Sequence, residues 1–114
     1  AAAGAVVGLE PNPPEYGCDY CTRVGEAAEL VREVNSPGFG LHLDAGGMAM
    51  TGDTVASAGD VRPVHFHISE PQLAEIGSTP GVPHDRFARE LRDAGYSGWY
   101  SVETRQPADG WQAA

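Results

Sequence analysis

Cysteine, basic side chains and long apolar runs are all scarce in this sequence. Its 114 residues include two cysteines and seven Lys or Arg against sixteen Asp or Glu, for a formal net charge of −9. Two cysteines are too few for a disulfide scaffold, which favours a cytoplasmic location. The acidity argues against a nucleic-acid partner, because phosphate binding normally needs a basic surface. No apolar run approaches the roughly 20 residues that cross a bilayer, so we expect no membrane segment.

The sequence does contain four short apolar runs, each ending in a residue that can ligate a metal. Residues two apart in a strand share a face, so in each run one face carries the ligand with small or polar neighbours. The other face is expected to pack on helices. The runs are Val6–Glu10, Gly40–Asp44, Val64–His67 and Trp99–Glu103, and the expected core residues are Val7, Leu9, Leu41, Leu43, Val64, Phe66 and Val102.

Helical patterns separate these runs. Thr22 is expected to be the N-cap of a helix ending near Val34. A short helix is expected around residues 54–58. Asp85 is expected to cap a later helix whose inward side chains are Phe87, Ala88, Leu91 and Ala94.

Strands that alternate with helices predict an α/β fold with a parallel sheet. A complete (β/α)8 barrel needs about 250 residues, so these four βα units are predicted to form half of a TIM barrel. Residues 1–107 are expected to form that unit and residues 108–114 a tail.

Several phrases together resemble a known family. They are Leu9-Glu10-Pro11, Tyr16-Gly17, Leu41-His42-Leu43-Asp44, Val64 to Ser69 and Gly95 to Glu103. In their order and spacing, these phrases resemble sequences of the sugar phosphate isomerase/epimerase group of the xylose-isomerase-like TIM barrel superfamily. The resemblance covers the C-terminal half of the family's barrel. The resemblance implies that Glu10, Asp44, His67 and Glu103 ligate a divalent metal, and that Glu10 and Glu103 also act as the acid/base pair. The family often has a His three residues after the Asp; here that residue is Gly47, which leaves the substrate open.

The expected activity is isomerisation or epimerisation of a sugar or sugar phosphate through an enediolate. A cation stabilises such an enediolate, while two carboxylates remove a proton and return one. One imidazole with three carboxylates suits Mn or Mg best, with Co or Zn as other candidates. His65, one layer below the ligands and able to support them, and Arg105 are the candidates for contacts with the substrate.

Other interpretations of the same residues stay open. Taken alone, Glu10 is explained equally by a solvated strand-end residue or a helix N-cap partner. Asp44 is explained by an Asx turn, and His65 by a buried, hydrogen-bonded core residue. The activity could instead be that of a polyol dehydratase of the same superfamily. The chain could also be a non-catalytic fragment that assembles through its sheet edges, as a homo-oligomer or with a missing N-terminal half-barrel.

Overall fold

The computed structural model of the chain describes residues 2–108 and 110. The expected tail, residues 108–114, lies outside the described residues except for Ala108 and Gly110. The strands are β1 (Val7–Leu9), β2 (Phe39–Asp44), β3 (Pro63–Ile68) and β4 (Tyr100–Val102). The α-helices are α1 (Val24–Val34), α2 (Ala45–Thr51) and α3 (His84–Asp93), and the short 3-10 helices are η1 (Pro14–Tyr16), η2 (Val55–Ala58) and η3 (Pro71–Leu73).

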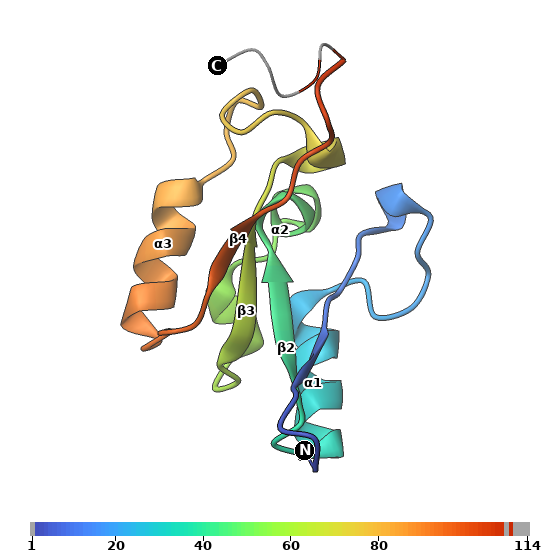
Figure 1. The fold of residues 1–114 in the computed structure, drawn as a ribbon, viewed down its shortest axis with the longest axis vertical. Helices are drawn as coiled ribbons and strands as arrows, with labels where there is room; N and C mark the ends of the chain where they lie inside the picture. Colours follow the sequence, from blue (N-terminus) through green and yellow to red (C-terminus); the bar gives the residue numbers. More distant parts are fainter. Residues whose placement is uncertain (1, 109, 111–114) are drawn as a thin grey trace.

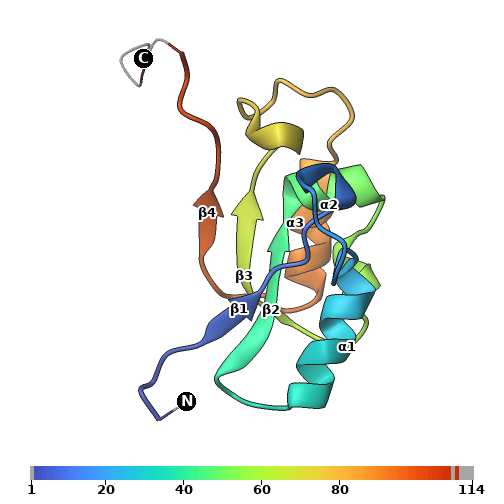
Figure 2. The same ribbon diagram turned by 90° about the vertical axis from the view of Figure 1, so that its right-hand side faces the viewer.

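The four strands form one parallel sheet in the order β1-β2-β3-β4, with helices between successive strands (Figure 1). This arrangement confirms the predicted partial TIM barrel. Figure 2 shows α1 and α3 on the same side of the sheet. No helix of the described chain combines the length and apolar character that a membrane crossing requires.

The hydrophobic core lies between the sheet and its helices. Leu41, Leu43 and Phe66 point into it from the two central strands and are almost completely buried. The helices contribute Val24, Ala27, Ala28, Phe87 and Leu91. The apolar face predicted for the central strands is therefore confirmed at these positions, because alternate residues of a strand point to opposite faces.

Three residues expected in the core are exposed instead. Val7 and Val102 are 64% and 63% exposed because they lie on the two edge strands. Val64 is 42% exposed for a different reason. The register of β2 with β3 shifts where Leu41 pairs with Pro63 but His42 pairs with His65, so Val64 is the extra residue of a bulge.

At the bulge, the successive residues Val64 and His65 both lie beside His42, on the face opposite the core. A Cβ on Gly40 would lie 2.3 Å from Val64 Cγ1, so glycine is needed on β2 beside it. Similarly, a Cβ on Gly8 would approach the Cβ of His42 to 3.0 Å. The glycines thus lie on the histidine-bearing face, as the alternation of residues predicts.

The helix starts differ from those expected. Thr22 does not cap α1; instead, the Asp53 carboxylate accepts a hydrogen bond of 3.0 Å from the Val24 N–H. Asp85 lies inside the first turn of α3 rather than at its cap, and Ala88 is exposed. The expected short helix at 54–58 is present as η2. The helix α2 was not expected, because two glycines among its first three residues weaken the helical signal.

Candidate metal centre

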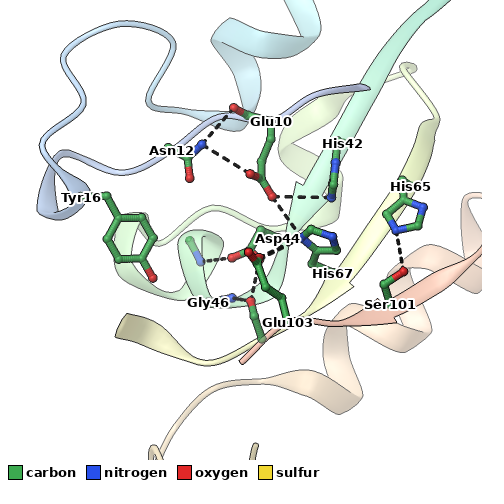
Figure 3. Close-up of polar contacts among 12 residues, drawn as sticks. Glu10, Asn12, Tyr16, His42, Asp44, Gly46, His65, His67, Ser101 and Glu103 are labelled. Carbon is green, nitrogen blue, oxygen red and sulfur yellow. Dashed lines mark hydrogen bonds and ion pairs between the residues drawn. The ribbon is translucent and has the colours of Figure 1, made fainter. Parts of the chain in front are cut away.

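The carboxyl ends of the strands bring four potential ligands to one place (Figure 3). Glu10 directly follows β1, Asp44 ends β2, His67 lies near the end of β3, and Glu103 directly follows β4. One ligand atom from each of these side chains lies within 4.8 Å of all the others. Parallel pairing causes the convergence, since it places all four carboxyl ends at the same edge of the sheet.

The Nδ1 atom of His67 lies among the three carboxylates. It is 3.0 Å from Glu103 Oε2, 3.3 Å from Glu10 Oε1 and 3.7 Å from Asp44 Oδ2. Both this nitrogen and Glu10 Oε1 are buried without an aligned hydrogen bond from any described residue. Buried polar atoms are almost always satisfied, so two such atoms facing each other fit a site that a cation completes. The donor set of three carboxylates and one imidazole suits a divalent ion.

Asp44 is held in place through both of its carboxylate oxygens. Oδ1 accepts the Gly47 N–H at 2.7 Å and caps α2, as the Asx-turn interpretation requires. Oδ2 accepts the Ser69 hydroxyl at 2.7 Å, while Ser69 Oγ accepts the Gly46 N–H at 2.8 Å. One oxygen therefore shapes the loop while the other is oriented toward His67, so both interpretations of Asp44 are compatible with the structure.

Burial, together with the clustered negative charge, raises the pKa of Glu10. Burial is the largest cause of its raised pKa, and the nearby carboxylates of Asp44 and Glu103 raise it further against an opposing effect of His67. Asn12 donates a weak hydrogen bond of 3.4 Å to the other Glu10 oxygen. A carboxyl group with a raised pKa is better suited to exchanging protons near neutral pH.

The two predicted substrate-contacting residues lie in different settings. His65 faces β4, where its Nε2 lies 2.9 Å from Ser101 Oγ. Arg105 is exposed just beyond Glu103, and its backbone N–H donates to the Leu73 carbonyl at 2.9 Å. The structure therefore brings His65 toward the other histidines, while Arg105 stays at the rim.

Sequence reasoning gave no role to two residues of this site. The Nε2 atom of His42 lies 3.5 Å from Glu10 Oε1 and is buried with no hydrogen bond to residues 2–108 or 110. Burial lowers the pKa of His42 to about 4, with further effects from His67 and His65. Its position two residues before Asp44 was the available signal. No such signal marked Ser69, whose contact with Asp44 joins residues far apart in the chain.

Known proteins of similar sequence and fold identify the family of this chain. The model of the xylose isomerase-like TIM barrel family matches residues 1–114. The chain belongs to that family. No curated protein matches it.

Among solved structures, 3-keto-D-glucoside 4-epimerase from E. coli matches with a TM-score of 0.79 and 26% identity, over 98% of this chain. D-allulose 3-epimerase from Methylomonas sp. matches at 0.78 and 25%, over 93% of this chain. A D-psicose 3-epimerase matches at 0.79 and 20% over 96%, which shows the fold alone. This chain spans 43%, 37% and 38% of those three proteins, respectively. The sequence resemblance and the partial barrel are thus confirmed.

Proposed function

We propose that this chain is the metal-binding part of a divalent-metal-dependent isomerase or epimerase acting on a sugar or sugar phosphate. Glu10, Asp44, His67 and Glu103 hold the cation, and Mn or Mg is the preferred ion. The observation that carries the proposal is the meeting of these side chains, one from each strand end, with ligand atoms within 4.8 Å of one another. The similarity to sugar epimerases supports the choice of reaction class.

The proposed chemistry divides between the cation and two glutamates. A divalent cation held by Glu10, Asp44, His67 and Glu103 would supply Lewis acidity toward the carbonyl and hydroxyl oxygens of the sugar. Glu10 and Glu103 come from the first and last strands of the sheet, so they approach the site from opposite sides. One carboxylate removes the proton beside the carbonyl, and the other returns a proton to the opposite face.

For full catalytic activity, the open side of the site must be closed by further protein. In the described chain the ligands belong to four strands, whereas the barrel of this fold has eight. Water reaching the open side raises the local dielectric and weakens the electrostatic stabilisation of an enediolate. We therefore propose that a further half-barrel closes the sugar pocket, and that His65 and Arg105 contact the substrate from this half.

Deuterium exchange tests this function. The 114-residue chain should bind Mn²⁺, seen as a rise in melting temperature with ion concentration, because binding to the native state stabilises it. By itself the chain should incorporate negligible deuterium from heavy water into a panel of ketoses and ketose phosphates. Adding an N-terminal half-barrel of a related epimerase should restore exchange.

Substitutions of Glu10 and Glu103 test their proposed acid/base roles, and a substitution of a surface glutamate is the control. In the complemented protein, Glu10→Gln or Glu103→Gln should abolish exchange, while Glu29→Gln, on the exposed surface of α1, should leave it unchanged. Exchange at an undiminished rate in the double Glu10→Gln/Glu103→Gln variant would refute the acid/base assignment. Loss of water from a cyclic polyol, without isomerisation, would indicate the dehydratase instead.

A further inference from the structure

A second group of metal-type ligands lies directly beside the carboxylates. One nitrogen from each of His42, His65 and His67 lies within 4.8 Å of the other two. Figure 3 shows the three rings side by side on β2 and β3. Their centroids are 4.2 Å apart for His42 and His67, 4.9 Å for His42 and His65, and 5.4 Å for His65 and His67.

The bulge at Val64 creates this group. Leu41 and Pro63 are paired and both buried, so an uninterrupted register would place Val64 beside His42 and turn His65 and His67 toward the core. The extra residue reverses the alternation, and His65 becomes the partner of His42 instead. Bulges that re-aim side chains are common next to functional sites.

Two of the three rings have a buried nitrogen that makes no hydrogen bond to a described residue, and the third is hydrogen-bonded. His42 Nε2 and His67 Nδ1 are both buried without a hydrogen bond within the part of the chain that the structure describes. His65 Nε2 has the Ser101 hydroxyl at 2.9 Å, which orients its ring. Leaving buried polar atoms unsatisfied costs free energy, and a cation at this place would remove part of that cost.

We propose that His42, His65 and His67 form a second, nitrogen-rich metal site that binds Zn²⁺ or Cu²⁺. Imidazole ligands suit these ions, whereas the carboxylate-rich group next to them suits Mn²⁺ or Mg²⁺. His67 belongs to both groups. The two sites therefore compete for one imidazole, and Zn²⁺ in the histidine site displaces Mn²⁺ from the carboxylate site. This inference goes beyond the proposed sugar chemistry; it shares His67 with the carboxylate site and His65 with the proposed substrate contacts.

Copper spectroscopy tests the ligand set directly. The chain, purified without a histidine tag and loaded with one equivalent of Cu²⁺, should show coupling to three nitrogens by electron paramagnetic resonance. His42→Ala and His65→Asn should each reduce that number. Coupling to one nitrogen in the unsubstituted chain would overturn the proposal.

The ratio of Zn²⁺ to Mn²⁺ affinity separates the two sites. In His42→Ala this ratio should fall by at least about tenfold. Loss of a residue that only hydrogen-bonds a metal ligand can already lower metal affinity by that factor, and His42 is proposed to be a ligand itself. In Glu103→Gln it should rise, because only the carboxylate site loses a ligand. His84→Gln is the matched control, since His84 is the one histidine outside the group and contacts Glu70; the ratio should stay constant.

An unchanged ratio in both His42→Ala and His65→Asn would refute the histidine site. Retained Mn²⁺ binding in these variants shows that they are folded. The sugar chemistry is judged separately by deuterium exchange, so either proposal can fail without the other.

Discussion

At the residue scale, Asp53 is the side chain on which the start of α1 depends. It is buried, and its carboxylate accepts hydrogen bonds from the Val24 N–H at 3.0 Å, from Thr51 at 3.0 Å and from Arg23 at 2.7 Å. Burial alone would raise the pKa of Asp53, but the hydrogen bonds from Arg23, Val24 and Thr51 outweigh burial, and the pKa is lowered.

We predict that Asp53→Ala lowers the free energy of unfolding by about 1–3 kcal/mol at pH 7, because a helix cap and a buried acceptor are lost. A carboxyl whose pKa is depressed by folding stabilises the protein above its ordinary pKa of 3.8, and that contribution disappears as the pH falls through the folded value. The difference between the two proteins in urea unfolding should therefore shrink from pH 7 to pH 3.

Asp60→Ala is the control, since Asp60 is 86% exposed in its ion pair with Arg32. Its effect should stay within about 0.5 kcal/mol. An Asp53→Ala effect of the same size at both pH values would show that the carboxylate charge is not what stabilises α1.

At the scale of elements, the short helix α2 links the loop after β3 to the candidate metal centre. Its Gly46 lies against the backbone of Glu70, where an added Cβ would be 2.5 Å from the carbonyl oxygen and 2.6 Å from its carbon. The Gly46 N–H also donates a hydrogen bond to the Ser69 hydroxyl, which in turn donates one to the Asp44 carboxylate. Close packing of two backbones thus supports the position of a proposed ligand.

Two glycine substitutions in helices should have effects of opposite sign. Gly46→Ala should destabilise the chain by about 1–3 kcal/mol, because backbone atoms cannot move aside for the methyl group. Gly25→Ala in α1 should stabilise it by about 0.4–1 kcal/mol, since the nearest atom to its added Cβ is 3.8 Å away and the unfolded chain loses freedom. Urea unfolding measures both. A neutral Gly46→Ala would mean that α2 does not pack against Glu70 in solution.

At the scale of the whole molecule, the sheet has two edge strands, β1 and β4, within the described residues. Apolar side chains are exposed along them: Val6, Val7, Trp99, Tyr100 and Val102. Edge strands with unpaired backbone groups favour pairing with another strand. A partner that pairs with these edges would also bury the exposed apolar side chains beside them, which favours the same association.

We predict that an N-terminal half-barrel covers Trp99, which is 82% exposed in this chain. In a Trp111→Phe variant, where Trp99 is the remaining tryptophan, adding that half should shift the emission to shorter wavelength and reduce quenching by acrylamide. Serum albumin added at equal concentration is the control. Unchanged Trp99 emission in a complex verified by size-exclusion chromatography would contradict closure along β4.

Much of this protein follows from local patterns in its sequence. Alternation of residues in Leu41–Asp44 assigns Leu41 and Leu43 to the core and places His42 and Asp44 on the opposite face, because side chains of a strand alternate. Parallel strands separated by helices then bring Glu10, Asp44, His67 and Glu103 to one edge, and the structure shows them together. Their assignment as ligands remains a proposal.

Other features depend on contacts between segments far apart in the chain. The bulge that exposes Val64 is a matter of register against β2, and the cap of α1 comes from Asp53 rather than from its neighbour Thr22. The exposure of Val7 and Val102 depends on which strands have a neighbour. The sequence by itself determined which residues alternate and which are able to ligate. Only the tertiary structure decided register, caps and edges, because each of these depends on a partner that the local sequence does not specify.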